Sequence, residues 1–596
     1  MRYDSRLLAG KAGAFSFVCL ECALSQPPSP SSLPPSPVPA QVDVQADVLV
    51  VGGGINGVGI ARDLAGRGWR VLLCEQDDLA SHTSSSSTKL IHGGLRYLEY
   101  KEFGLVRKAL QERERLLRSA PHIMWPLRFV LPHDASMRPA WMIRLGLWLY
   151  DHLARREFLP GSHGVALQRS VLGVPLKPGW RKGFVYSDGW VDDARLVVLC
   201  AQDAQARGAT VLTRTRCEAV RPEGDGWRAT LRPRDAHTGE AQAPIEVQAR
   251  CVVNAAGPWA EHLLRQVMNV APTATAGGAV SADRPESGGR LRLVKGSHII
   301  VPRLFEHDHA YIFQGQDRRI IFAIPYEGEF TLVGTTDVEY HGDPSKVAIE
   351  ADEVQYLCRE LGRYLAQPIR PQDVVWTYAG VRPLLDDEHG DAAAVTRDYL
   401  LQAQRAPAPW LTVWGGKLTT FRVLSEQAAQ QVGALLGEPL GEPVGEGRRA
   451  WTAQATLPGG DMGALMGEAV QPGQAHAQFT RWLQRRCPWL PEAVLRRWAR
   501  SYGAAVTTLL GEARSVADLG PEIAPGVHEC ELRYLWRHEW ARTGQDVLWR
   551  RSKLGLHLSP AGREAVERWC ALTAQQGGVA SGQDASGAAG KMAGPP

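Results

Sequence analysis

The stretch that decides the fold is ADVLVVGGGINGVGIARDLAGRGWRVLLCEQ, residues 46–76. It opens with Val48–Val51, a short apolar run that is typical of a strand buried on both faces of a parallel sheet. A glycine-rich turn follows, then a stretch with the apolar spacing of a helix, which ends at Gly66 and Gly68. A second apolar run, Val71–Cys74, completes a strand–helix–strand unit. This order predicts an α/β domain built on a parallel sheet.

The turn carries a dinucleotide-binding pattern. Gly52, Gly54 and Gly57 form G-x-G-x-x-G directly after the first predicted strand and at the start of the predicted helix. In such folds the first glycine permits the tight turn, the second admits the pyrophosphate to the backbone, and the third lets helix and strand pack closely. The phosphates bind at the helix N-terminus. We therefore predict that this turn, with Gly53 and Asn56 inside it, binds a dinucleotide.

An acidic residue supports the same prediction. Glu75 ends the second predicted strand, 18 residues after Gly57, where a carboxylate accepts hydrogen bonds from an adenosine ribose. An acid at this place disfavours the 2′-phosphate of NADP. The pattern does not separate FAD from NAD. A glycine-rich turn in an ordinary α/β fold is the alternative to a binding site.

Composition narrows the class of protein. The chain has 596 residues and a formal net charge of +4, long enough for more than one domain and too weakly basic for a dedicated nucleic-acid binder. Its ten cysteines are scattered, and no second Cys-x-x-Cys follows Cys19–Cys22 at zinc spacing. We therefore expect no metal site, and reduced thiols in a cytosolic protein. No apolar segment reaches the length that spans a bilayer.

The rest of the chain divides into segments that differ in composition and in hydrophobic pattern. Residues 26–40 are rich in proline and serine, and the stretch from Ala271 is of low complexity, typical of a surface insertion. RIIFAIPY and FTLVGTTD, residues 319–326 and 330–337, predict two antiparallel strands joined by a short turn. After about residue 440 the pattern becomes helical.

Seven motifs in fixed order carry a resemblance. They are GGGINGVGIARDLAGRG (52–68), SSSSTKLIHGGLRYLE (84–99), YSDGWVDDARLV (186–197), KGSHIIVPR (295–303), VGTTDVEY (333–340), WTYAGVRPL (376–384) and WGGKLTTFR (414–422). Together they resemble the FAD-dependent, respiratory glycerol-3-phosphate dehydrogenases, over about residues 46–560. Phe421 and Ser425 depart from that pattern, which has tyrosine and alanine there.

The resemblance implies a fold and a reaction. The fold is an α/β flavoprotein with a glutathione-reductase-like FAD-binding Rossmann domain, an antiparallel substrate domain of the D-amino-acid-oxidase type, and a C-terminal helical domain. The reaction oxidises sn-glycerol 3-phosphate to dihydroxyacetone phosphate by hydride transfer to FAD, and ubiquinone or menaquinone then takes the electrons. An oxidase that uses O₂, or a related FAD-dependent amino-acid or amine oxidase, is the alternative.

We expect four regions. They are a disordered extension with a Pro/Ser linker (1–45), an FAD-dependent oxidoreductase domain whose two subdomains are interleaved (46–435), a helical domain (440–574) and a disordered tail (575–596).

A phosphate dianion requires cations. Arginine suits it because the guanidinium binds phosphate through paired hydrogen bonds. The candidates are Arg96, Arg382, Arg397 and Lys417. Arg382 follows a predicted strand, where packing gives little reason for an arginine. A surface ion pair, with the acidic run 386–388 in the case of Arg382, is the alternative for it and for Arg397.

Oxidation of a secondary alcohol also requires that its hydroxyl lose a proton. His92 is the first candidate for the general base, because the ordinary pKa of histidine lies near neutrality. It could instead only orient substrate or flavin, and His298 is a weaker candidate. Tyr97 and Thr335 are predicted to hydrogen-bond the substrate. We predict catalytic roles for His92 and Arg382.

Further cofactor contacts are predicted from position along the chain. Hydroxyls that follow the ribose-binding strand suit a pyrophosphate, and a glycine turn before a helix can aim N–H groups at a flavin. The alternatives are a flexible polar loop and a solvent-facing lysine. The predicted residues are Ser86, Ser87, Thr88, Lys89, Gly257, Gly416, Lys417, Leu418 and Thr419.

One segment suggests membrane contact. RPAWMIRLGLWLYDHLARR, residues 138–156, combines tryptophan, leucine and arginine as interfacial helices do, although an apolar helix is more often part of a core. The resemblance implies monotopic association with the inner, cytoplasmic membrane. A homodimer is one assembly compatible with it, and the sequence does not fix the oligomeric state.

Overall fold

The computed structural model describes residues 43–577, except residues 136, 271–290, 318, 386–397 and 439–448. The predicted extension before residue 43, most of the tail, the insertion from Ala271 and Arg397 lie outside the described residues. So does the side chain of Arg96.

The strand–helix–strand unit forms as predicted. Strand β1 (Asp43–Val51) leads into helix α1 (Ile55–Gly66) and strand β2 (Val71–Cys74), and the strands pair in parallel with Val48 opposite Val71. Their apolar side chains are buried because helices cover the sheet: α4 (Asp193–Ala206) and α7 (Phe421–Leu435) pack beside α1.

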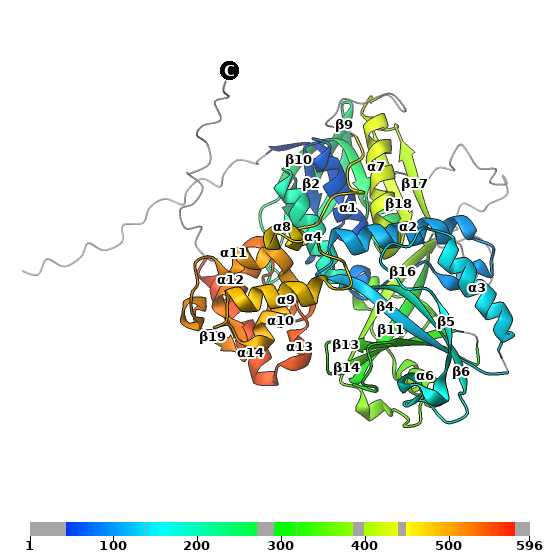
Figure 1. The fold of residues 1–596 in the computed structure, drawn as a ribbon. Helices are drawn as coiled ribbons and strands as arrows, with labels where there is room; N and C mark the ends of the chain where they lie inside the picture. The colour runs from blue at the N-terminus through cyan, green and yellow to red at the C-terminus, as the bar shows by residue number, and fades with distance from the viewer. Residues whose placement is uncertain are drawn as a thin grey trace, which may run out of the picture. The chain divides into compact units, whose positions relative to one another are not determined.

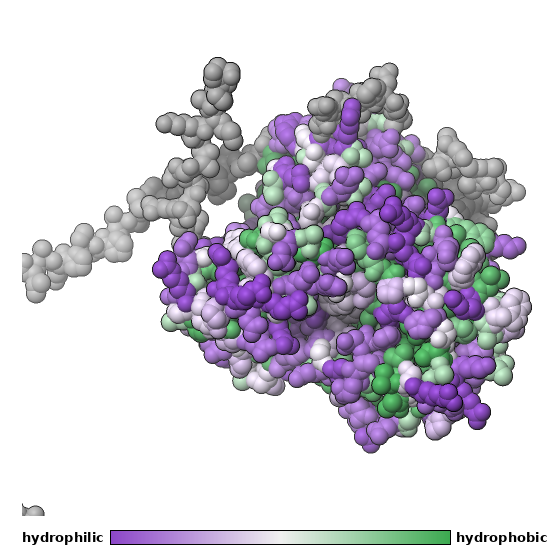
Figure 2. All heavy atoms as spheres, in the orientation of Figure 1, coloured by the Kyte–Doolittle hydropathy of each residue, from purple (hydrophilic) through white to green (hydrophobic). Residues whose placement is uncertain are grey.

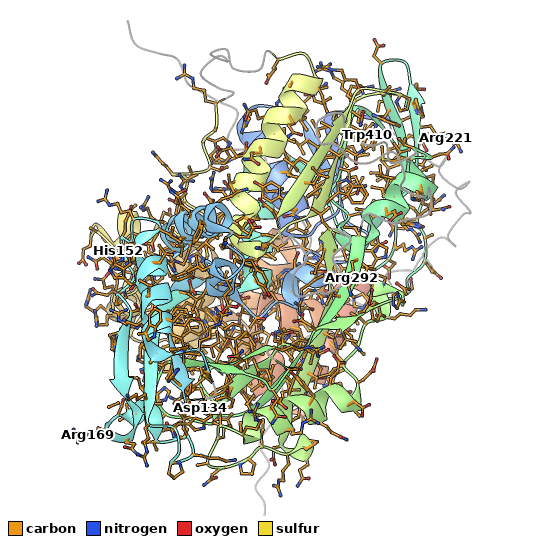
Figure 3. All side chains as sticks on the ribbon, turned by 90° about the vertical axis from the view of Figure 1, so that its right-hand side faces the viewer. Asp134, His152, Arg169, Arg221, Arg292 and Trp410 are labelled. Carbon is orange, nitrogen blue, oxygen red and sulfur yellow. The ribbon has the colours of Figure 1, made fainter. Side chains whose placement is uncertain are left out.

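The first sheet draws strands from distant parts of the chain. Its order is β17–β18–β10–β1–β2–β7, with β8 and β9 forming a hairpin on β10 (Figure 1). The added strands are β7 (Thr210–Leu212), β8 (Thr215–Glu223), β9 (Gly226–Pro233), β10 (Ile245–Asn254), β17 (Tyr399–Gln404) and β18 (Trp410–Gly415). Because β18 lies beyond the whole second sheet in sequence, the two subdomains interleave. In Figure 3, Trp410 and Arg221 mark the first sheet and Arg292 marks the second.

The second sheet is largely antiparallel. Its order is β15–β11–β14–β13–β12–β4–β6–β3, with β16 on β11 and β5 on β6. The predicted hairpin is confirmed as β13 and β14, with Phe322 opposite Gly334. The strands are β3 (Leu90–Ile91), β4 (Met124–His133), β5 (His163–Ala166), β6 (Lys182–Val191), β11 (Leu291–Pro302), β12 (Ala310–Gln314), β13 (Ile320–Tyr326), β14 (Phe330–Gly334), β15 (Val338–Glu339) and β16 (Trp376–Leu385).

Helices flank the second sheet. Helix α6 (Ala351–Gly362) packs against one face, and α2 (Phe103–Ser119) and α3 (Ala140–His152) lie toward the other. The outer side of α3 exposes large apolar residues. Figure 2 shows hydrophobic surface at the right-hand edge, where Figure 1 places this helix. Among the described residues, no helix is both long enough and apolar enough to cross a membrane.

The C-terminal part is helical and has its own apolar core, which confirms the predicted helical domain. Its α-helices are α8 (Met462–Met466), α9 (Ala475–Arg486), α10 (Glu492–Tyr502), α11 (Val506–Leu510), α12 (Glu529–His538), α13 (Leu554–His557) and α14 (Pro560–Gln575). The domain also contains a π-helical turn, η13 (Asp546–Arg551), and a small hairpin of β19 (Glu522–Ala524) and β20 (Val527–His528).

Candidate functional site

A cavity of about 760 Å³ lies where the carboxyl ends of β1, β2 and β10 meet the second sheet. This edge of a parallel sheet is where doubly wound folds bind their ligands. The predicted site residues that line the cavity are Gly52, Gly54, Asn56, Glu75, Ser86, Ser87, Thr88, His92, Tyr97, Gly257, Thr335, Arg382, Gly416, Lys417, Leu418 and Thr419. Segments from seven places in the chain therefore surround one space.

The glycine turn is shaped as a cradle. Gly52 has φ +116°, and a Cβ on it would lie 2.5 Å from the backbone oxygen of Ala255. A Cβ on Gly57 would lie 1.9 Å from the oxygen of Gly52, so helix and turn meet without room for a side chain. Gly54 is the N-cap residue before α1, and as a glycine it has no side chain that could cap the helix. These positions leave the backbone open to a phosphate at the helix N-terminus.

Gly53 and Gly57 support the cradle from behind and do not line the cavity. The N–H of Gly53 donates to Oε2 of Glu75 at 2.6 Å, and Oε1 of Glu75 accepts from the N–H of Asp77 at 2.9 Å. Burial raises the pKa of Glu75, and these two hydrogen bonds oppose that rise. The predicted ribose acceptor is thus fixed at the rim of the cradle.

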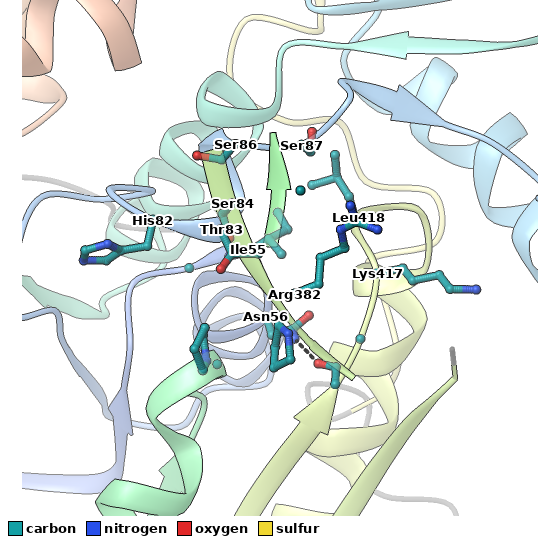
Figure 4. A pocket seen from close by; sticks show the side chains of 18 of the residues that line it. Ile55, Asn56, His82, Thr83, Ser84, Ser86, Ser87, Arg382, Lys417 and Leu418 are labelled. Atoms are coloured by element: carbon teal, nitrogen blue, oxygen red, sulfur yellow. Dashed lines mark hydrogen bonds between the residues drawn. The ribbon is translucent and has the colours of Figure 1, made fainter. Parts of the chain in front are cut away.

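Residues 84–88, which we call the serine run, form one wall of the cavity (Figure 4). Oγ of Ser84 accepts from the N–H of Ile55 at 3.0 Å, which joins the run to the start of α1. Oγ of Ser87 donates to Asp193 at 2.7 Å, and Oγ1 of Thr88 lies 3.0 Å from Nε2 of His298. These contacts fix the serine run in place as part of the cavity wall, which the alternative of a flexible polar loop does not explain.

The side chain of Lys89 is held by partners outside the cavity. Its ammonium donates to Oδ1 of Asp193 at 2.7 Å and to the oxygen of Ser85 at 3.1 Å, and the residue is 2% exposed. It is not among the residues that line the cavity. Its charge is used in a buried ion pair, because an unpaired ammonium would be costly there. The Lys89 side chain thus supports the serine run, and a contact between Lys89 and the cofactor stays a prediction.

The turn before α7 meets the start of α1. Nδ2 of Asn56 donates to the oxygen of Gly415 at 3.1 Å, and Gly416 has φ +106° (Figure 4). The ammonium of Lys417 lies 4.2 Å from the centre of the Tyr97 ring, and Oγ1 of Thr419 accepts from the N–H of His92 at 3.2 Å. The turn thereby brings Lys417 to the segment that carries His92 and Tyr97.

Arg382 reaches the cavity from β16. It donates to Asp337 at 2.6 Å, to the oxygen of Thr336 at 2.9 Å and to Oγ1 of Thr335 at 3.2 Å. Its ion-pair partner is thus Asp337, and the acidic run 386–388 lies outside the described residues. The guanidinium passes directly over Gly296, where a Cβ would lie 2.1 Å from Nη2.

The comparisons with known proteins cover most of the chain. Residues 47–422 match the family model described as FAD dependent oxidoreductase, and residues 450–583 match the C-terminal domain of alpha-glycerophosphate oxidase. The chain belongs to the FAD-dependent oxidoreductase family.

Relatives of this oxidoreductase are similar along nearly their whole length. A glycerol-3-phosphate dehydrogenase of Pseudomonas aeruginosa is 50% identical over 517 residues, 86% of this chain and 93% of that one. A D-erythritol 1-phosphate dehydrogenase of Brucella abortus is 45% identical over 88% of this chain and 97% of its own. The glycerol-3-phosphate dehydrogenase of Bacillus halodurans, solved with FAD, has a TM-score of 0.66 at 26% identity and covers 89% of this chain and 90% of its own.

The residues of the oxidoreductase fit FAD. The open cradle at Gly52 and Gly54 suits a pyrophosphate, and Glu75 suits a ribose. On the far side, Gly380 allows β16 to approach the serine run, since a Cβ there would lie 2.6 Å from Cβ of Ser86. No group of three or more His, Cys, Asp or Glu side chains among the described residues could hold a metal ion.

The two candidate bases of the oxidoreductase differ in surroundings. His298 is buried, stacks on Tyr378 at 4.7 Å and contacts Thr88. Burial, together with the charges of Arg382 and Lys89, lowers the pKa of His298 well below its ordinary value. His92 lines the cavity beside Tyr97. The surroundings thus favour His92 for proton transfer, and its role stays a prediction.

A buried hydrogen-bond network lies next to the His92 segment, and it was not predicted from the sequence. The hydroxyl of Tyr150 donates to Asp188 at 2.7 Å and accepts from the N–H of Gly93 at 2.8 Å. Arg113 donates to Asp188 at 2.6 Å. Asp188 lies within YSDGWV, an acid in a strand of buried residues, and that pattern could have indicated a polar network.

A second network, below Arg382, was also missed. Glu353 of α6 accepts from the hydroxyls of Ser297 at 2.9 Å and Thr336 at 2.7 Å, and pairs with Lys295 at 2.9 Å. Burial alone would raise the pKa of Glu353, but hydrogen bonds from the Glu350 N–H, Lys295, Thr336 and Ser297 together lower it. The network fixes the strand end that carries Thr335 and Asp337.

Proposed function

We propose that this oxidoreductase converts sn-glycerol 3-phosphate to dihydroxyacetone phosphate, with FAD as the hydride acceptor and a membrane quinone as the next electron carrier. The observation that carries the proposal is one cavity that joins the dinucleotide cradle to Arg382, Lys417 and His92. Two cations suit a phosphate dianion better than the single carboxylate of an amino acid. The names and extents of the relatives support the same substrate class.

The chain's own residues would act as follows. Arg382 and Lys417 bind the phosphate, and Thr335 and Tyr97 orient the substrate. Arg96 and Arg397 stay predicted contributors. His92 accepts the proton of the secondary hydroxyl as its carbon loses hydride. Bound FAD supplies the hydride acceptor. Gly416, Leu418 and Thr419, which line the cavity, would hold it through their backbone N–H groups.

The first experiment follows the visible absorbance of the bound flavin without oxygen. Glycerol 3-phosphate should bleach it rapidly, D-erythritol 1-phosphate more slowly, and an amino acid not at all. Faster bleaching by D-erythritol 1-phosphate would identify that compound as the preferred substrate, and the proposed class of reaction would still hold. If neither phosphate bleaches the flavin, the proposed function is wrong. A His92→Asn variant should slow bleaching strongly, whereas an orienting histidine would leave much of the rate.

The apolar end of the cavity supports the proposal that a quinone accepts the electrons. Phe129 stacks on Tyr186 at 5.3 Å and meets Phe322 edge-on at 5.8 Å, and Ile312 is paired opposite Phe322. All four line the cavity on strands β4, β6, β12 and β13, whereas Arg382 comes from β16. An aromatic wall suits a flat, apolar ring.

Reoxidation of the flavin separates quinone from oxygen as acceptor. A soluble quinone analogue should restore the oxidised spectrum quickly, with little peroxide released in air. A Phe322→Ala variant should slow reoxidation by the analogue while reduction by substrate keeps its rate. Peroxide formation at the rate of turnover would instead identify an oxidase.

Membrane association is proposed through α3. Trp141, Leu145 and Trp148 are 67%, 55% and 50% exposed, and their spacing places them on one side of the helix. Arg138 and Arg155 flank it. Such a face lies in the headgroup region of a bilayer and binds anionic lipid. We propose peripheral attachment to the inner, cytoplasmic membrane.

Sedimentation with anionic vesicles tests the attachment. A Trp141→Ser, Leu145→Ser double variant should bind vesicles at least about tenfold more weakly, since each side chain contributes roughly 1–3 kcal/mol on burial. The exposed Val174, changed to serine, is the control. Equal binding by both variants would exclude α3. Homodimer formation stays a prediction, which sedimentation velocity would check.

A further inference from the structure

Five charged residues join the loop after β2 to the C-terminal domain. We call them the Asp78 cluster: Asp78, Arg214, Asp546, Arg550 and Arg551. Arg551 donates to both oxygens of Asp78 at 2.6 Å, and Nε of Arg550 donates to Oδ2 of the same carboxylate at 2.6 Å. Arg550 and Arg214 both also bind Asp546. Asp78, Asp546 and Arg551 are almost completely buried.

The cluster sits directly behind the adenosine end of the cavity. Asp78 is three residues after Glu75 and does not line the cavity, whereas Gln76 and Ala80 on either side of it do. The N–H of Ala80 donates to the oxygen of Gly53 at 3.3 Å, so this loop also touches the glycine turn.

The second wall of that end is tied to the same cluster. Arg214 follows β7, and its N–H donates to the oxygen of Asp77 at 2.7 Å. The next residues, Thr215, Arg216 and Cys217, line the cavity. Asp546 lies in η13 and binds the Arg214 side chain, so one carboxylate of the C-terminal domain holds this wall while Arg550 and Arg551 hold the other.

We propose that the C-terminal domain is part of the FAD-binding apparatus, and that Asp78, Arg550 and Arg551 are positioning residues for the adenosine half of the cofactor. A carboxylate held by two guanidinium groups is fixed in direction as well as distance. Its loop carries the predicted ribose acceptor Glu75. The proposal depends on FAD binding and not on the identity of the substrate or the acceptor.

Other contacts already hold the C-terminal domain in place. Arg500 pairs with Glu327 at 2.8 Å, and Trp549 stacks on Trp376 at 3.8 Å, both against the second sheet. Replacing a buried ion pair by apolar residues is often neutral or stabilising. Attachment of the C-terminal domain therefore does not by itself explain the Asp78 cluster. What it adds is a fixed geometry beside the cradle.

The test measures release of FAD from the full-length holoenzyme. Flavin fluorescence rises when FAD leaves, and the rate is followed after dilution into buffer without FAD. Arg550→Lys keeps the charge but loses the fork that spans Asp78 and Asp546, and we expect FAD release to be about tenfold faster or more. Asp78→Asn should have a larger effect.

Arg500→Lys is the matched control, because it weakens another ion pair of the same domain away from the cradle. It should change FAD release less than about twofold. Thermal unfolding of each variant, with and without added FAD, reports folding separately. If Asp78→Asn does not fold, Arg550→Lys decides alone, since Arg550 is at the edge of the cluster. Unchanged FAD release in folded Arg550→Lys, or equal acceleration in Arg500→Lys, would overturn the proposal.

Discussion

Gly296→Ala is the sharpest available perturbation of the proposed phosphate site. Gly296 lies inside β11, opposite Gly380 of β16, and the Arg382 guanidinium passes over it. An added Cβ would lie 2.1 Å from Nη2 of Arg382 and 2.8 Å from Oγ1 of Thr335. Since ordinary van der Waals contact begins at 3.4 Å, the guanidinium must move by about 1.3 Å.

The size of the effect follows from what that movement breaks. A shift of this size removes the hydrogen bond from Nη2 to Thr335 and misdirects the group that would bind phosphate. A hydrogen bond to a charged group contributes about 1.5–3 kcal/mol. At about 1.4 kcal/mol per factor of ten, the KM for glycerol 3-phosphate should rise roughly 10- to 100-fold. The same lost hydrogen bond lowers the free energy of unfolding, and the roughly 0.5–1 kcal/mol by which alanine suits a strand better than glycine offsets part of that loss.

Steady-state kinetics with a soluble quinone analogue measure this KM, and inhibition by inorganic phosphate gives an independent constant. Both constants should weaken together, while kcat at saturating substrate falls less. Gly164→Ala is the control, because Gly164 lies in strand β5 and a Cβ there meets no atom within 4 Å. A KM that stays within twofold of the wild type in the folded Gly296→Ala protein would refute the placement of the phosphate at Arg382.

Three further predictions concern the cofactor, the His92 segment and acid stability. Gly57→Ala should yield protein with little bound flavin, visible as a low ratio of flavin to protein absorbance, because its Cβ would meet the Gly52 oxygen at 1.9 Å. Tyr150→Phe removes a hydrogen bond to Asp188 and should lower the free energy of unfolding by about 1.5–3 kcal/mol in urea, and slow flavin reduction; an unchanged reduction rate would separate this network from the chemistry. The pKa of Glu353 lies below its ordinary value of 4.5, so its stabilisation is complete above that pH and is lost as the pH falls through the lower folded pKa. The advantage of wild type over Glu353→Gln in urea titrations should therefore shrink below about pH 4.5, and a constant advantage would exclude a titrating Glu353.

The parts of the fold that local pattern specifies were predictable. Strand β2 has the predicted bounds Val71–Cys74, because a buried parallel strand between two turn signals leaves little choice of ends. The β13–β14 hairpin is as local, and Gly52, Gly54 and Gly57 form a pattern that six neighbouring residues contain.

The partners of the site residues were not predictable in the same way. Arg382 pairs with Asp337, and Lys89 with Asp193, across 45 and 104 positions of the chain. Such pairs depend on which strands become neighbours, and a pattern along one strand does not contain that information. Lys89 was predicted from its place in the sequence to contact the cofactor, and its ion pair with the distant Asp193 was not foreseen.

Cys74 and Cys217, at the adenosine end of the cavity, have a consequence for the durability of the enzyme. Contact with the Cys217 thiol, together with burial, raises the pKa of Cys74 well above its ordinary value, so at neutral pH that sulfur stays protonated. Peroxide attacks thiolates and is slow toward thiols. A flavoenzyme that leaks an occasional electron pair to oxygen makes its own peroxide a short distance away. A protonated Cys74 would therefore be slow to oxidise where such peroxide reaches the cavity.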